Sequence, residues 1–97
     1  MIIAGIEWDD GNLRKCGKHG VSIAEIEFVL LNKPRIAPDA AHSCTEPRQI
    51  AVGRTTAGRP IFVAFALRMR QGEWYIRPIS ARYMHQKEVD AYEKAST

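Results

Sequence analysis

The sequence predicts an α+β fold in which a small antiparallel β-sheet packs against helices from the N-terminal third and a helix at the C-terminal end. Apolar residues recur at helical spacing between residues 22 and 33, whereas residues 48–80 read as consecutive strands separated by short turns. Residues 84–95 again have helical spacing. Because 97 residues leave room for one hydrophobic core, we expect a single domain over residues 1–97.

The N-terminal third is expected to hold one short strand and two helices. Residues 3–8 are apolar enough for a strand or an extended entry, and the polar stretch that follows can begin a short helix over residues 12–17. Ser22 and Glu25 form a capping box at the start of a longer helix. Pro34 ends that helix because its ring lacks the amide donor and clashes with the preceding turn.

The rest of the chain is expected to form the sheet and the closing helix. Residues 35–47 read as a loop with one short edge strand. The three main strands are expected over residues 48–55, 60–68 and 74–80. Turns at Gly58 and Gly72 are short enough for antiparallel hairpins, and Pro78 should lie at an edge or a bulge because proline cannot donate to a ladder.

The composition favours a soluble domain with an anionic partner. Hydrophobic residues make up 45% of the chain, charged residues make up 26%, and the formal net charge at pH 7 is +3. No apolar run reaches the roughly 18–20 residues of a membrane span, and the first residues lack the basic head of a signal peptide. We therefore expect a cytoplasmic protein without a membrane partner, in which Cys16 and Cys44 are free thiols.

Several kinds of chemistry have no matching pattern in the sequence. His19, His42 and His85 show no short ligand spacing with one another or with a cysteine. There is no glycine-rich phosphate loop and no nucleophile elbow. We expect neither a metal nor a cofactor.

The positive signal comes from cations. Arg14, Lys15, Lys18 and His19 lie in one early segment. The sheet and its turns supply Arg54, Arg59, Arg68, Arg70, Arg77 and Arg82. Planar guanidinium groups suit bidentate contact with phosphate, so these residues favour a nucleic-acid ligand.

Each of these residues also has a structural interpretation. Arg54 and Arg77 could form ion pairs with Glu7, Asp9 or Glu73, and Arg68 and Arg70 could simply be solvated. His19 could act as a general acid or base, or be a helix-entry residue bonded to backbone. Trp8 is interpreted as a core anchor rather than a base-stacking platform, and the tyrosines could stack on bases or cap the core.

The order of short motifs along the chain resembles the BrnT family of type II toxin–antitoxin toxins. The motifs are Glu7-Trp8-Asp9, Lys18-His19-Gly20-Val21-Ser22, Gly53-Arg54 before Gly58-Arg59, Arg77-Pro78-Ile79-Ser80-Ala81-Arg82, Lys87-Glu88 and Tyr92-Glu93. The resemblance covers roughly residues 6–94. Each motif alone is weak, but their order and spacing together are specific.

The resemblance implies a RelE-like fold and a metal-independent ribonuclease that blocks translation. It also implies a hetero-oligomer with a BrnA-like antitoxin, whose ribbon-helix-helix part binds operator DNA. Lys18 and His19 match the Lys-His-Gly element, Arg54 matches the arginine of Gly-Arg, and Arg77 and Arg82 match the arginines of the Arg-x-Ile-Ser-Ala-Arg strand.

We therefore expect an endoribonuclease in which Arg54, Arg77 and Arg82 converge on the scissile phosphate. The ribose 2′-OH would attack this phosphate, and His19 or Lys18 would help to transfer the proton. The alternative is a non-catalytic subunit whose basic face binds the antitoxin or nucleic acid and takes part in operon autoregulation. A third interpretation is a housekeeping domain whose cations are only solvated.

Overall fold

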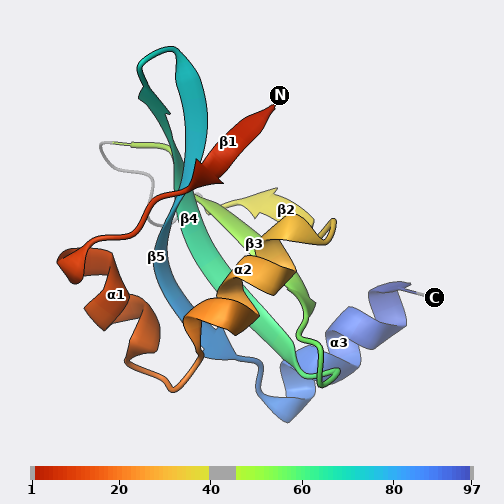
Figure 1. Cartoon of the computed structure of the whole chain (residues 1–97). Helices are drawn as coiled ribbons and strands as arrows, with labels where there is room; N and C mark the ends of the chain where they lie inside the picture. The colour runs from red at the N-terminus through yellow and green to blue at the C-terminus, as the bar shows by residue number, and fades with distance from the viewer. Residues whose placement is uncertain (1, 40–45, 97) are drawn as a thin grey trace.

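The computed structural model describes residues 2–39 and 46–96 and has the predicted α+β architecture (Figure 1). The helices in these residues are α1 (Asp10–Gly17), α2 (Ile23–Leu31) and α3 (Gln86–Ser96). The strands are β1 (Ile3–Ile6), β2 (Arg35–Pro38), β3 (Gln49–Arg54), β4 (Pro60–Arg70) and β5 (Glu73–Tyr83). His42 and Cys44 lie outside the described residues, so the expectations for them stay predictions.

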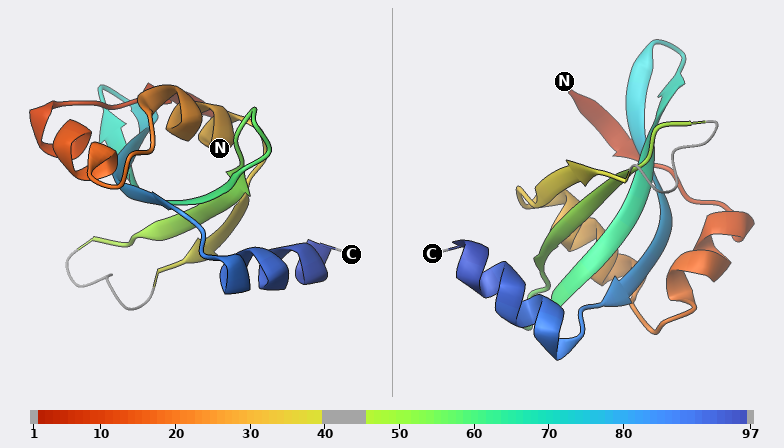
Figure 2. Two further views of the ribbon diagram at one scale, coloured as in Figure 1. Left: turned by 90° about the horizontal axis from the view of Figure 1, so that it is seen from below. Right: turned by 180° about the vertical axis from the view of Figure 1, so that it is seen from behind.

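The strands form one sheet in the order β1-β5-β4-β3-β2. β1 runs parallel to β5, whereas all the other neighbours are antiparallel. Helices α1 and α2 lie over one face of the sheet and α3 lies over the other (Figure 2). No helix in the described part of the chain is long and apolar enough to cross a membrane.

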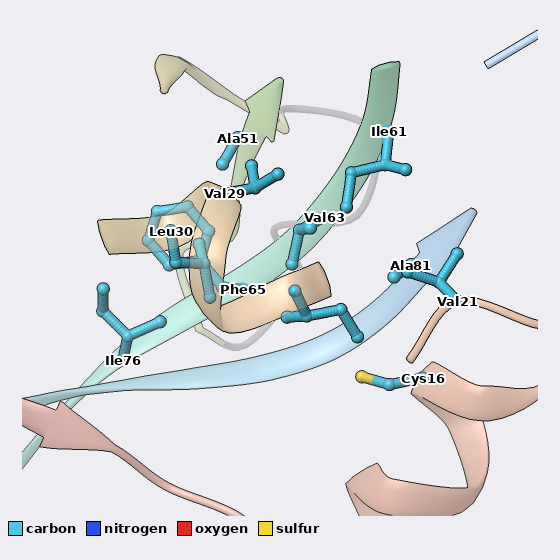
Figure 3. Close-up of a cluster of buried hydrophobic side chains, with 11 residues drawn as sticks. Cys16, Val21, Val29, Leu30, Ala51, Ile61, Val63, Phe65, Ile76 and Ala81 are labelled. Atoms are coloured by element: carbon cyan, nitrogen blue, oxygen red, sulfur yellow. The ribbon is translucent and has the colours of Figure 1, made fainter. Parts of the chain in front are cut away.

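The hydrophobic core lies between the sheet and the two N-terminal helices (Figure 3). β4 is central and contributes Ile61, Val63 and Phe65, which alternate along the strand and are buried. α2 approaches β3 closely because Gly53 has no side chain: a Cβ there would lie 3.0 Å from Cγ1 of Val29. The capping box predicted for Ser22 and Glu25 is present at the start of α2.

The alternate residues of the same strands point to the opposite surface, which we call the α3 face. The register places on this face Ile50, Val52 and Arg54 of β3, Phe62, Ala64, Ala66 and Arg68 of β4, and Arg77, Ser80 and Arg82 of β5. Both faces of β4 are thus mostly apolar, as expected for a central strand. The α3 face nevertheless carries arginines from three strands, and it is the part of the fold that positions the candidate site.

Both predicted hairpins are present. Gly58 has a φ of 82° in the turn between β3 and β4. The turn between β4 and β5 places Gln71 and Gly72 at φ values of 52° and 81°, as a type I′ turn requires. These turns fix the antiparallel register of the three long strands.

Pro78 lies beside a bulge in β5, as the sequence predicts. Ala64 pairs with Ser80 and Phe65 pairs with Pro78, so Ile79 is an extra residue in β5. The buried side chain of Asn12 fastens this point to α1, because its Nδ2 donates to the carbonyl oxygens of Glu7 and Pro78, at 2.9 Å each. The short side chain at residue 12 therefore links α1 and the exit from β1 to β5.

Several element boundaries differ from the sequence prediction; β4, for example, ends at Arg70 rather than at residue 68. α1 begins at Asp10 rather than near residue 12, because Asp9 and Asn12 form a capping box. β5 continues to Tyr83, which pairs with Ile61, so it passes the expected end at residue 80. α3 consequently begins at Gln86 rather than at residue 84.

Candidate functional site

A pocket of about 430 Å³ opens on the α3 face, and we call it the Arg82 pocket. It is lined by His19, Asp39, Arg48, Ile50, Phe62, Ala64, Ser80, Ala81, Arg82 and Glu88. Its charged groups come from the α1–α2 loop, the segments that flank β2 and β3, the end of β5, and α3. Residues that are distant in sequence thus surround one cavity that is large enough for a phosphate group and its neighbouring atoms.

Arg82 binds a carboxylate inside this pocket. Its Nη1 and Nη2 donate to the two carboxylate oxygens of Glu88, both at 2.9 Å. The guanidinium carbon lies 4.4 Å from the centroid of the Phe62 ring. Arg82 holds the pKa of Glu88 at about 2, helped by the backbone N–H of His85, and the same ion pair raises the pKa of Arg82.

His19 lies in the loop between α1 and α2 and lines the Arg82 pocket. Its side chain is exposed and makes no hydrogen bond or ion pair with any residue that the structure describes. Lys18 is also exposed, and it borders a neighbouring surface with Arg14 and Lys15 rather than the pocket itself. The loop therefore places the imidazole of His19, but not the amine of Lys18, in the pocket that contains Arg82.

Arg77 lies in a second pocket of about 240 Å³, which we call the Arg77 pocket. It is lined by Gly11, Asn12, Lys15, Glu46, Arg48, Arg68, Arg77, Pro78 and Ile79. Arg77 donates to Asp9 at 2.7 and 3.2 Å and to Glu7 at 3.2 Å. The structural interpretation of Arg77, an ion pair with a nearby carboxylate, is thus confirmed. This contact lowers the pKa of Asp9 to about 2 and raises the pKa of Arg77.

Arg54 lies at the other end of the α3 face. Its Nη2 donates to Glu93 at 2.9 Å and its Nη1 donates to the carbonyl oxygen of Gly58 at 2.8 Å. Its guanidinium carbon is 5.6 Å from the ring centroid of Tyr92. Arg54 therefore fastens the β3–β4 turn to α3, and it lines neither the Arg82 pocket nor the Arg77 pocket.

The expected convergence of Arg54, Arg77 and Arg82 on one phosphate is not found. In the register between β4 and β5, Arg82 lies opposite Phe62 and Arg77 lies opposite Ala66. The two arginines are therefore four residues of β4 apart, which is about 14 Å along the strand. Arg54 is on β3, two strands and about 10 Å away from β5. All three point to the same face of the sheet, but a single phosphate is too small to touch them together.

Comparison with protein families gives a direct assignment. A family model described as "Ribonuclease toxin, BrnT, of type II toxin-antitoxin system" matches residues 8–88. The chain belongs to the BrnT family. Its members are ribonuclease toxins of type II toxin–antitoxin systems, so the family gives this chain an RNA target and an antitoxin partner. A comparison with curated proteins gives no significant match.

The match to the BrnT family includes every residue that lines the Arg82 pocket. Sequence reasoning missed Arg48, Ser80 and Glu88 as members of this site. Arg48 stands two residues before Ile50 in an alternating strand pattern, so its place on the α3 face could have been found from that spacing. Glu88 could not, because its contact with Arg82 depends on where α3 lies.

One other interpretation needs correction. Simple solvation was the structural interpretation of Arg68 and Arg70, but Arg68 forms an ion pair with Glu46 at 2.8 Å and Arg70 forms one with Glu7 at 3.1 Å. Both lie near the Arg77 end of the α3 face, where carboxylates offset part of the arginine charge. Trp8 packs against the core as expected, and its Nε1 donates to Glu27 at 3.0 Å.

The remaining groups of interest are buried or apart from one another. Cys16 is a free, buried cysteine, and burial raises the pKa of its thiol to about 11. It therefore stays protonated near neutral pH and is a poor nucleophile. Within residues 2–39 and 46–96, no group of three or more His, Cys, Asp or Glu side chains is placed to hold a metal ion.

Replacing Asp9 by asparagine is expected to lower stability at neutral pH and to reduce its dependence on pH. Asparagine still caps α1 but cannot pair with Arg77. Because the folded-state pKa of Asp9 is about 2, below the ordinary 3.8, its ionised form stabilises the fold above pH 3.8 and loses this effect as pH falls through 2. The melting temperatures of Asp9→Asn and wild type should therefore converge on acidification. Asp10→Asn is the matched control, and a difference that is independent of pH would contradict the ion-pair explanation.

Proposed function

We propose that this protein is a metal-independent endoribonuclease toxin that cleaves messenger RNA and so inhibits translation in the cytoplasm. The observation that carries the proposal is the Arg82 pocket, in which two arginines and a histidine surround one cavity in a chain of a ribonuclease toxin family. We further propose a RelE-like relationship for its helix-covered antiparallel sheet.

The proposed reaction uses the 2′-OH of the substrate as nucleophile. This hydroxyl gives its proton to a base and attacks the adjacent phosphorus, and the P–O5′ bond breaks. The products are a 2′,3′-cyclic phosphate and a 5′-OH, which takes up a proton. Arg82 and Arg48 stabilise the charge on the phosphate oxygens, and His19 transfers a proton. Lys18, from the same loop, adds positive charge beside the pocket.

A phosphate that binds Arg82 must replace the carboxylate of Glu88. The Glu88 carboxylate occupies the two outer nitrogens of the guanidinium with the bidentate geometry that a phosphate would use. The Nε of Arg82 donates to no residue that the structure describes. A phosphate can therefore enter beside Nε and displace Glu88, whose side chain is about one-third exposed.

Cleavage of labelled RNA by the purified protein is expected to persist at full rate in excess EDTA. The proposed reaction takes its nucleophile from ribose and its electrostatic stabilisation from arginine, so no step needs a divalent ion. A substrate with 2′-deoxyribose at the cleaved position should stay intact, and the 5′ fragment should end in a cyclic phosphate.

Loss of cleavage on chelation, with recovery on addition of Mg²⁺, would contradict this mechanism. Cleavage of the 2′-deoxy substrate would contradict it independently. A heat-denatured sample and a preparation of Arg82→Ala purified identically control for contaminating ribonuclease.

The proposed partner is a BrnA-like antitoxin with a ribbon-helix-helix part, which would form a hetero-oligomer with the toxin and bring it to operator DNA. One observation favours the alternative, a non-catalytic antitoxin- or nucleic-acid-binding subunit: Arg54, Arg77 and Arg82 each already bind a carboxylate. Tight antitoxin binding without RNA cleavage at stoichiometric protein would support this alternative.

A further inference from the structure

One end of α1 carries positive charge that the described structure does not neutralise. Arg14, Lys15, Lys18 and His19 form no ion pair with any residue in the ranges 2–39 and 46–96. The arginines of the sheet differ, because Arg54, Arg68, Arg70, Arg77 and Arg82 all bind carboxylates. The last turn of α1 and the loop after it therefore offer positive charge to an external anion without competition from a described ion pair.

The same segment borders both pockets of the α3 face. Lys15 lines the Arg77 pocket, and His19 lines the Arg82 pocket. Arg48 lines both, so the two pockets adjoin. The two pockets thus form a track along β5 from Arg82 to Arg77, with His19 at the Arg82 end and Lys15 at the Arg77 end.

The separation along this track matches an extended ligand better than a single anion. Arg82 and Arg77 are about 14 Å apart along the strand direction, because they lie opposite β4 residues that are four positions apart. Arg77 uses Nη1 and Nη2 for Asp9 and Glu7, and its Nε donates to no described residue. Lys15 can supply a full, uncompensated charge beside it.

We propose that Lys15 and Arg77 form a second phosphate subsite, which binds the backbone of single-stranded RNA several atoms away from the phosphate held at Arg82. This subsite rests on the proposed ribonuclease function and adds the path of the substrate to it. Its ligand is a phosphodiester of the same strand, and it contributes affinity rather than chemistry.

A purely structural role of Lys15 predicts something different. Cations in the last turn of a helix interact favourably with the helix dipole, and Lys15 is in the last turn of α1. In that case Lys15→Gln would change the melting temperature slightly and would leave RNA binding unchanged. The two roles can therefore be separated by measuring both quantities.

The test is fluorescence anisotropy with labelled 2′-O-methyl RNA, which cannot be cleaved, as a trinucleotide and as a 12-mer. Lys15→Gln is expected to weaken binding of the 12-mer roughly three- to ten-fold, as for one lost charge-assisted contact, and to leave the trinucleotide unaffected. The slope of log affinity against log salt should fall by about 0.7. Lys33→Gln, an exposed lysine beside β2, is the matched control.

Equal affinities of Lys15→Gln and Lys33→Gln for the 12-mer would overturn the subsite, and so would an equal loss for both RNA lengths. If Arg82→Gln still weakens both RNAs in that experiment, the proposed function survives this failure. Wild-type protein that binds neither RNA would overturn both proposals. Competition by duplex DNA as strong as by single-stranded RNA would assign the track to DNA and also overturn the subsite.

Discussion

Replacing Arg82 by alanine is expected to reduce RNA cleavage by about 100- to 1,000-fold, the range seen when one donor to a developing oxyanion is removed. Arg82 lines the Arg82 pocket together with Arg48 and His19, and it is held there by Glu88 and by the ring of Phe62. Initial rates with labelled RNA at saturating protein measure this effect. The melting temperature should change little, because the Arg82 and Glu88 side chains are both about one-third exposed or more.

Glu88→Gln distinguishes phosphate binding from the structural role of the ion pair. Glutamine can still accept the backbone N–H of His85 at the start of α3, but it no longer neutralises Arg82. We expect this variant to cleave at least as fast as wild type and to bind RNA more tightly. A loss of cleavage as large as that of Arg82→Ala would show that the pair itself, and not the free guanidinium, is what the reaction needs.

Replacing Asn12 by aspartate is expected to destabilise the fold by about 3–5 kcal/mol, a large part of the stability of a domain of this size. Asn12 is 3% exposed, and its Nδ2 donates to two backbone carbonyl oxygens. In the aspartate variant, a carboxylate oxygen would replace Nδ2 and face the two carbonyl oxygens with no hydrogen to donate. The volume of the side chain would be almost unchanged. Urea denaturation of both proteins at pH 7 measures the free energy of unfolding.

Asn32→Asp is the matched control, since Asn32 is exposed at the end of α2 and its Nδ2 donates to the carbonyl oxygen of Phe28. Its cost should be much smaller. The pKa of the carboxyl at position 12 should be raised in the folded state, so Asn12→Asp should recover stability as pH falls, because the protonated group can donate again. Equal losses for both variants would contradict the role assigned to Asn12.

The fold was largely predictable because its signals are local. The Ser22–Glu25 capping box, the glycines at positions 58 and 72, and the two apolar faces of β4 each depend on neighbouring residues only. The error at the end of β5 arose where distant segments meet. β5 is longer than expected because its last residues pair with the start of β4, a contact that the sequence of β5 alone does not contain.

The candidate site was predicted only in part: His19 and Arg82 line the Arg82 pocket, whereas Lys18, Arg54 and Arg77 do not. Strand alternation correctly groups Arg54 with Ile50 and Val52 on one face, yet it contains no information about how far β3 lies from β5. The bulge after Pro78 and the position of α3 then decide which arginine meets which carboxylate. Convergence of arginines is therefore a property of strand register and order, which the spacing of residues along one strand does not determine.

The outer edge of β2 limits how a partner protein can associate with the sheet. Asp39 donates its backbone N–H to the carbonyl of Arg48, so the alternating pattern turns the backbone groups of Ile36 and Pro38 outward. Pro38 has no amide hydrogen, which leaves Ile36 as the single donor along this edge of the strand. A strand added at this edge would therefore find an interrupted hydrogen-bond ladder, which is one way in which edge strands avoid uncontrolled self-association.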